Sequence, residues 1–171
     1  MKVYTTEQSA WSHFLFTNTK TAPLWLVVRL YVGYIWFMAG WEKLQDPVWN
    51  SGQALNGFVQ NALTKTTGPH PDVAWWYAHF LQSSVLAHLS LWTHLVPLGE
   101  LCIGLGLMFG LFVGAAAFFS VFMSYNFLLA GTVSINPILI FFGFLLMLAR
   151  RVAGRIGLDR YIAPRLRKLF R

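Results

Sequence analysis

The sequence has few charged residues and a single cysteine. Charged side chains make up 11% of the 171 residues, and Asp and Glu together number six. Cys102 has no second cysteine with which to form a disulfide, and no Cys-x-x-Cys-His segment for haem attachment is present. No glycine-rich nucleotide-binding motif follows a strand pattern. The sequence therefore predicts no bound electron carrier, and we interpret Cys102 as a small packing residue within a helix.

The five histidines are also uninformative about metal chemistry. His70, His79, His88 and His94 are scattered along the chain without the spacing of metal ligands. Interfacial contacts or core packing explain them more simply. We predict no metal site.

The sequence is rich in apolar and aromatic residues. Hydrophobic residues account for 56% of the chain and aromatic residues for 17%, which is too apolar for a soluble domain of this size. The length leaves room for about four membrane spans of about 20 residues each. We therefore predict an all-α polytopic membrane protein: a bundle of four transmembrane helices that forms one domain over residues 1–171.

The apolar runs and their breaks give the expected spans. Pro23 opens the first run and Gly110 marks a tight turn between the second and third. A signal peptide is the competing interpretation of the first run, but that run is long, starts well inside the chain and has no small-x-small cleavage site after it. The predicted spans are 23–44, 89–108, 111–130 and 136–149.

Residues 45–84 are less apolar and are predicted to form a long outer loop. Three of the seven prolines lie here, yet apolar residues recur at helical spacing between Ala54 and Leu63, and Trp75, Trp76 and Phe80 form a second such group. Trp and Tyr prefer the membrane interface. The loop is therefore expected to contain short helices lying on the membrane surface.

The basic residues predict the orientation. Eight of the thirteen Lys and Arg residues fall within residues 150–171. The positive-inside rule places this tail in the cytoplasm, and four spans then place both termini inside and the 45–84 loop outside. A basic tail is also compatible with nucleic acid, but beside a membrane helix we favour binding to anionic lipid. No nucleic-acid partner is predicted.

Arg29, Lys43 and Glu100 are charged residues that lie within or at the end of the apolar spans. At about 1.5 Å per residue, Arg29 lies about 9 Å from Pro23, and Glu100 lies about 12 Å from Met108, so the two are expected to meet at similar depth. A lone charged Glu there would cost about 3 kcal/mol, so Glu100 should be protonated or paired with Arg29. Lys43 shares a helical stripe with Arg29, whereas Glu42 points to the opposite side.

Each of these residues also has a structural interpretation. Arg29 and Glu100 together could simply fix the register of the bundle, and Lys43 could be an ordinary interfacial anchor. The polar residue of the third apolar run, Asn126, could form a hydrogen bond between helices. His94 lies off the stripe that contains Glu100.

The order of these residues resembles the DoxX/DoxD family of four-helix membrane proteins. The resemblance rests on Arg29 with Gly33, then Gly40-x-x-Lys43-Leu44, then Pro97-x-x-Glu100, with Asn126 on the next helix, and it covers about residues 22–150. The long segment between the first two spans is more similar to the DoxD branch, the small membrane subunit of thiosulfate:quinone oxidoreductase.

The resemblance implies a function in sulfur metabolism. Such a subunit helps to oxidise thiosulfate outside the cytoplasmic membrane of a prokaryote and passes two electrons to quinone, which is a substrate. In that family a DoxA subunit accompanies DoxD, so a DoxA-like partner is expected. For this function we predict Glu100, Lys43 and Arg29 as catalytic residues, and Trp36, Asn126 and His94 as contacts for substrate or quinone.

Two other functions remain open at this point. A small transporter would also explain polar residues inside the membrane, although with four spans it would need to act as a homo-oligomer. The other alternative is a membrane anchor without catalytic activity, which would dock a redox partner through the 45–84 loop.

Overall fold

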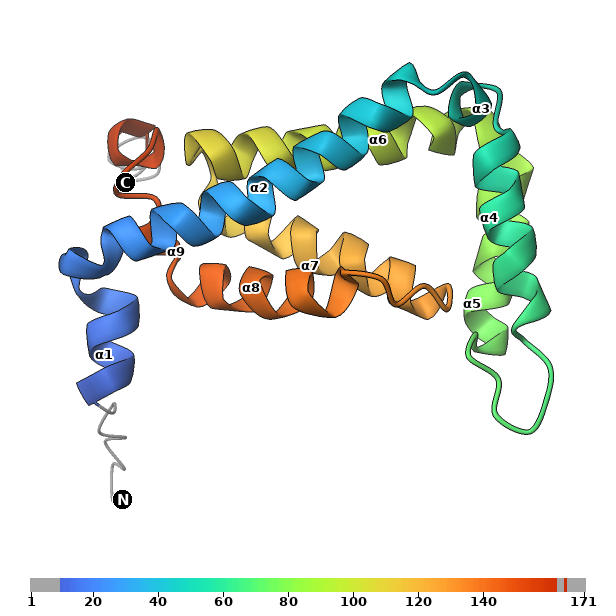
Figure 1. The fold of residues 1–171 in the computed structure, drawn as a ribbon, viewed down its shortest axis with the longest axis horizontal. Coiled ribbons are helices and arrows are strands. Elements are labelled where there is room, and N and C mark those ends of the chain that lie inside the picture. The colour runs from blue at the N-terminus through green and yellow to red at the C-terminus, as the bar shows by residue number, and fades with distance from the viewer. Residues whose placement is uncertain (1–9, 163–164, 166–171) are drawn as a thin grey trace.

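The computed structural model describes residues 10–162 and Arg165. Every regular element in this part of the chain is a helix, which confirms the predicted all-α fold. Four apolar helices form the bundle: α2 (Ala22–Gln45), α6 (Leu89–Phe109), α7 (Val113–Leu129) and α8 (Asn136–Leu148). The shorter α-helices are α1 (Ala10–Thr17), α3 (Pro47–Asn50), α4 (Gln53–Thr64), α5 (Trp75–Phe80) and α9 (Arg150–Ala153) (Figure 1).

Helices α2 and α6 form a tightly packed antiparallel pair. A Cβ atom added to Gly40 would lie 2.7 Å from the carbonyl oxygen of Pro97, and one added to Gly104 would lie 2.5 Å from the backbone nitrogen of Phe37. Only glycine permits the two backbones to approach so closely, as in many membrane helix pairs. These contacts fix the register, because Gly33 faces Gly104 in the same way that Gly40 faces Pro97.

Helices α7 and α8 form a second layer beneath this pair (Figure 1). Gly143 brings them together, since its added Cβ would lie 2.6 Å from Val121. The turn between α6 and α7 contains Gly110 at φ 66° and Phe112 at φ 49°. Gly110 therefore forms the tight turn that the sequence predicts, and the second positive φ delays the start of α7 to Val113.

Two of the apolar segments are long enough to cross a membrane. Thr19–Gln45 and Trp75–Phe109 meet the length and composition of a span, while α7 and α8 are shorter apolar helices. The second segment is not straight. It bends through a π turn at Leu81–Val85 and a 3-10 turn at Leu86–His88, so that α5 runs across the end of the bundle and α6 runs along it (Figure 1).

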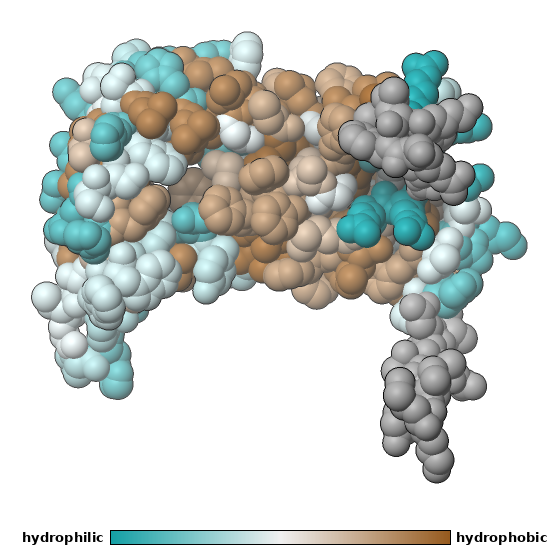
Figure 2. Space-filling view, turned by 180° about the vertical axis from the view of Figure 1, so that it is seen from behind, coloured by the Kyte–Doolittle hydropathy of each residue, from teal (hydrophilic) through white to brown (hydrophobic). Residues whose placement is uncertain are grey.

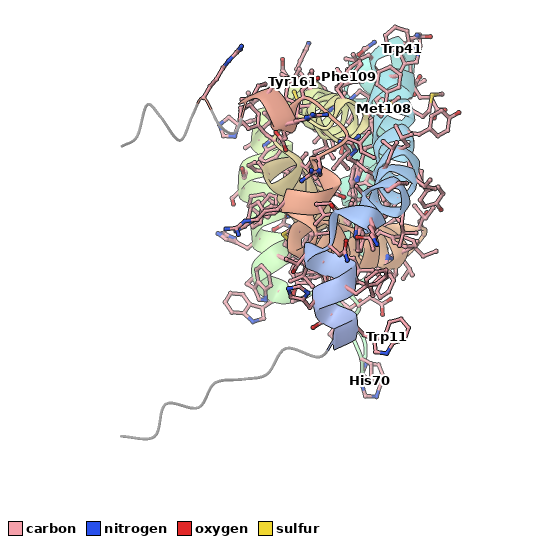
Figure 3. The ribbon with its side chains drawn as sticks, turned by 90° about the vertical axis from the view of Figure 1, so that its left-hand side faces the viewer. Trp11, Trp41, His70, Met108, Phe109 and Tyr161 are labelled. Atoms are coloured by element: carbon pink, nitrogen blue, oxygen red, sulfur yellow. The ribbon has the colours of Figure 1, made fainter. Side chains whose placement is uncertain are left out.

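Helices α4 and α5 lie across one end of the bundle in the segment where short helices were predicted (Figure 1). They have their own hydrophobic cluster, in which Val59 and Val73 are fully buried. At the opposite end lie α1 and α9, with Arg150 and Arg151 exposed; we call this the arginine end. Trp11 and His70, from the two ends, project to the same side of the bundle (Figure 3).

The surface between these two ends is strongly apolar. Figure 2 shows a broad hydrophobic band across the middle of the molecule with hydrophilic residues at both ends. Large exposed side chains on the bundle helices include Leu98, Phe118 and Phe141. A contiguous apolar surface of this kind is expected where lipid replaces water as the solvent.

Candidate functional site

The central feature of the molecule is an ion pair between α2 and α6. Lys43, in the last turn of α2, places its Nζ 2.9 Å from Oε1 of Glu100. The Glu100 side chain is 1% exposed and the Lys43 side chain is 23% exposed. Gly40 makes this contact possible, because a side chain there would collide with Pro97 and Leu101. The pair therefore extends from a partly open mouth at Lys43 to a closed interior at Glu100.

Only one oxygen of the Glu100 carboxylate is used. Oε2 is buried and has no hydrogen-bond partner among the described residues. A buried carboxylate oxygen without a donor is costly when charged. It is also a site where a proton can be held. The geometry thus gives Glu100 two alternatives, an ion pair with Lys43 or a neutral carboxyl group.

Trp49 closes the pair on the side of the mouth. Lys43 Nζ lies 5.3 Å from the centre of the Trp49 ring, a cation–π contact. The indole Nε1 of Trp49 donates a 2.8 Å hydrogen bond to the carbonyl oxygen of Thr93. That oxygen would normally accept from the backbone nitrogen four residues later, but this residue is Pro97, which has no N–H. Trp49 therefore supplies the hydrogen bond that the proline removes.

The orientation of Lys43 agrees with its place on the helical stripe. Its ammonium group turns into the bundle, and it also lies 3.3 Å from the carbonyl oxygen of Ala39. The neighbouring Glu42 is exposed. The sequence prediction that Lys43 faces inward and Glu42 outward is confirmed in this respect.

The expectation that Arg29 meets Glu100 is wrong. Arg29 is 1% exposed and donates from Nη2 to the carbonyl oxygen of Ile156 at 2.7 Å. Its guanidinium lies against Gly110 and Gly157, at the arginine end. Gly110 is ten residues beyond Glu100 on the chain, about 15 Å at helical rise. The depth estimate failed because α2 extends past the end of α6, so equal distances from the helix ends are not equal heights.

Arg29 belongs instead to a contact that fastens residues 156–159 to the turn between α6 and α7. Asp159 accepts hydrogen bonds from the backbone nitrogens of Phe112 (2.7 Å) and Val113 (3.0 Å), which caps the start of α7. Sequence reasoning missed this role. The available signal was that Asp159 is the single acidic residue among the eight basic residues of positions 150–171.

Each of the three candidate contacts for substrate or quinone has its own hydrogen-bond partner. Trp36 is buried and donates from Nε1 to Ser120 Oγ at 2.7 Å. Asn126 donates to the Phe122 carbonyl and accepts from the Tyr77 hydroxyl at 3.2 Å. His94 is exposed on α6, and its Nδ1 lies 2.7 Å from the Ser90 carbonyl oxygen.

One further polar atom lies inside the bundle near Trp36. Ser124 is one helical turn beyond Ser120 on α7, and its Oγ is buried without a partner among the residues described. The α7 face that packs inside the bundle therefore carries two hydroxyl groups. The Ser120 hydroxyl accepts the hydrogen bond of the Trp36 indole, while the Ser124 hydroxyl has no partner among the described residues.

No side-chain group suited to a metal is found in the described part of the chain. Among residues 10–162 and Arg165, no three His, Cys, Asp or Glu side chains lie close enough together to hold a metal ion. Cys102, which we interpreted as a packing residue, is in fact exposed on α6. It lines an apolar groove of about 530 Å³ between α6 and α7. That groove lies on the face of α6 opposite to Glu100.

Comparison with known proteins identifies the family. The family model for DoxX matches residues 24–132, well over half of the chain. The chain belongs to the DoxX family. The match includes the motif residues Arg29, Lys43, Glu100 and Asn126, so the ion pair lies within the part that defines the DoxX domain. No significant match was found among curated proteins or among solved structures.

Membership has two consequences for this DoxX protein. The family is associated with membranes, which agrees with the two apolar segments long enough to cross one. The matched residues run from α2 to the turn after α7. The family region therefore contains both members of the ion pair and the helices α3 to α5 at its mouth.

Proposed function

We propose that this DoxX protein is the membrane subunit of a thiosulfate:quinone oxidoreductase, with the Lys43–Glu100 pair as its working site. The observation that carries the proposal is the geometry of Glu100. One carboxylate oxygen is held by a partly exposed ammonium group, and the other is buried without a partner among the described residues. Such a group can hold either a proton or the ion pair with Lys43.

The reaction needs both states of the pair. Two thiosulfate dianions form one S–S bond, yield tetrathionate and release two electrons; a quinone accepts these and two protons to become quinol. When Glu100 is protonated, Lys43 carries an unpaired positive charge that attracts a sulfur dianion to the mouth. Glu100 gives one proton to the reduced quinone, takes up a second proton from water at the partly exposed Lys43, and gives that proton to the quinone as well. The Lys43 ion pair that forms after the second transfer releases the anionic product.

The supporting residues act through this pair. Trp49 covers the Lys43 ammonium and fixes the mouth, while Gly40 lets Lys43 reach α6. Arg29 has no part in the chemistry of this proposal, because it lies at the arginine end and holds the Ile156 carbonyl. Quinone approaches from the lipid, and a DoxA-like subunit is the proposed partner on the side of α4 and α5.

The proposed topology follows from the charge distribution. Helices α2, α6, α7 and α8 cross the cytoplasmic membrane of a prokaryote, with both termini in the cytoplasm. The excess of Lys and Arg in residues 150–171 supports this orientation. Helices α3 to α5 then lie on the outer surface, where exposed Trp75 and Trp76 suit the headgroup region. Lys43 faces the same compartment as the proposed electron donor.

A second function is favoured by one observation. Trp49 donates a hydrogen bond to the Thr93 carbonyl and also contacts the Lys43 ammonium group, so it holds the ion pair in place between α2 and α6. This arrangement also suits a membrane anchor that performs no chemistry and presents α4 and α5 to a redox partner. In that case the pair sets the register between α2 and α6 and nothing more.

Turnover in nanodiscs distinguishes the two functions. The purified protein, alone and with its co-purified partner, is tested for thiosulfate-dependent reduction of a short-chain quinone. Glu100→Gln and Lys43→Met should each lower turnover at least tenfold while thermal unfolding stays cooperative. Lys65→Met is the matched control, because Lys65 lies at the same end and donates to the Gly131 carbonyl rather than to an acid. Unchanged turnover in Glu100→Gln, or no turnover by the folded wild type with its partner, would support the anchor instead.

A further inference from the structure

The groove between α6 and α7 is a feature that the proposed function does not use. Its volume is about 530 Å³, and its walls include Cys102 and Phe109 of α6 and Ala115, Phe119 and Met123 of α7. Ala115 and Phe119 are exposed, so the groove opens on the outer face of the bundle. It exists because α6 packs tightly on α2 and α7 packs tightly on α8, which leaves α6 and α7 more loosely matched to each other.

The chemistry of the walls selects the kind of occupant. Of the residues that line the groove, Cys102 alone has a polar hydrogen on its side chain, and a thiol is a weak donor. A quinone ring would find no group to bind its carbonyl oxygens. A hydrocarbon chain needs no such group and gains contact with the aromatic walls.

The length of the groove fits one leaflet of a bilayer. Along α6 it extends from Gly99 to Phe109, about 15 Å at helical rise. The hydrocarbon core of a bilayer is about 30 Å thick, so the groove is as deep as one acyl chain. It runs from the middle of the bundle to the arginine end, where Phe109 and Phe112 form its mouth.

A segment that carries basic residues is bonded to the backbone at this mouth. The backbone nitrogen of Leu158 donates to the carbonyl oxygen of Phe109 at 3.1 Å, and Asp159 binds the backbone nitrogen of Phe112 at 2.7 Å. These bonds place Arg160 beside the mouth, and Arg155 belongs to the same segment; both are exposed. Figure 3 shows Phe109 and Tyr161 on the same side of the bundle, seen from this end. Interfacial Tyr and Arg are the residues that meet lipid headgroups.

We propose that this groove binds one acyl chain of an anionic glycerophospholipid, with the headgroup phosphate held by Arg160 and Arg155. The lipid belongs to the leaflet that meets the arginine end. Its chain lies between α6 and α7, along Ala115 and Phe119, and fills the space that protein side chains leave. The site is separate from the Lys43–Glu100 pair, which faces the opposite side of α6.

Native mass spectrometry of protein released from nanodiscs tests the site. The nanodiscs contain equal amounts of phosphatidylglycerol and phosphatidylcholine, and the lipids that stay bound are counted. We expect one retained phosphatidylglycerol, favoured over phosphatidylcholine by more than about tenfold, since two basic residues act on one headgroup. Arg155→Gln with Arg160→Gln should remove the preference. Arg150→Gln with Arg151→Gln is the matched control, because Arg150 packs on Gly114, on the face of α7 away from the groove.

A second variant tests the groove itself. Ala115→Trp fills it with a side chain and should abolish lipid retention, whereas Ala87→Trp, at an exposed alanine outside the groove, should not. Thermal unfolding confirms that both variants are folded. The proposal is overturned if wild type retains no lipid, retains both lipids equally, retains quinone, or appears as a dimer whose contact Ala115→Trp disrupts.

Discussion

The two ends of the α2–α6 pair each bury a charge, but in different ways. At one end, Lys43 and Glu100 form a neutral pair whose lysine is 23% exposed and whose carboxylate has a spare oxygen. At the other end, Arg29 is 1% exposed and donates to a backbone carbonyl, with Asp159 close enough to attract it. Arg cannot lose its proton in a protein, whereas Lys and Glu can change charge. Arg29 is therefore a fixed structural charge, whereas the Lys43–Glu100 pair can gain or lose a proton.

Removing Glu100 should have the largest effect on stability. Glu100→Ala leaves the Lys43 charge without its partner, and breaking a buried pair in this way costs about 3–5 kcal/mol. Replacing both residues, as Lys43→Met with Glu100→Met, should cost much less. A double-mutant cycle by denaturant unfolding in detergent measures this coupling. Equal and additive losses would show that the two charges do not depend on each other.

Adding a methyl group at Gly157, at the arginine end, should have an intermediate effect on stability. In Gly157→Ala the new Cβ would lie 2.6 Å from Arg29 Nη1 and 2.8 Å from Gly110 Cα, so the 156–159 segment must shift. Overpacking of this kind costs about 1–3 kcal/mol. Limited trypsin digestion should then cut faster at Arg155 and Arg160. Gly57→Ala is the control, because nothing lies within 4 Å of its added Cβ. Faster cutting at Arg155 and Arg160 in that variant too would contradict a specific role for the contact between Arg29 and residues 156–159.

The smallest expected effect on stability is that of a substitution at Trp49. Trp49→Phe keeps the ring near Lys43 but loses the hydrogen bond to the Thr93 carbonyl, at about 1 kcal/mol. Adding Pro97→Ala to this variant restores an N–H that can bind the same oxygen. The second substitution should therefore stabilise the Trp49→Phe protein more than it stabilises wild type, as measured by thermal unfolding. An identical effect in both backgrounds would mean that Trp49 does not compensate for the proline.

The sequence predicted local features well. Helical spacing between Ala54 and Leu63 identified α4, the glycine at position 110 identified the turn, and the wheel turned Lys43 inward. Each of these rests on neighbours within a few turns of one helix. Such neighbours are readable from spacing alone.

Contacts between distant segments were beyond the sequence. Arg29 was paired with the wrong residue because the register of two helices depends on where glycines let backbones touch, here Gly40 against Pro97. Counting from helix ends cannot reveal that offset. Asp159 and Trp49 were missed for a related reason. Their partners, Val113 and Thr93, are 46 and 44 residues away in the chain, and no spacing rule connects them.

Infrared difference spectroscopy of Glu100 tests the central claim most directly. The protein in nanodiscs is compared before and after addition of thiosulfate, and the carbonyl band of a protonated carboxyl group is followed, with Glu100→Gln as the reference. We expect thiosulfate to increase this band in wild type and not in the variant, because the dianion draws Lys43 away and Glu100 takes up a proton. A band that does not respond to thiosulfate in wild type, or that responds equally in Glu100→Gln, would contradict the account of the Lys43–Glu100 pair as the working site.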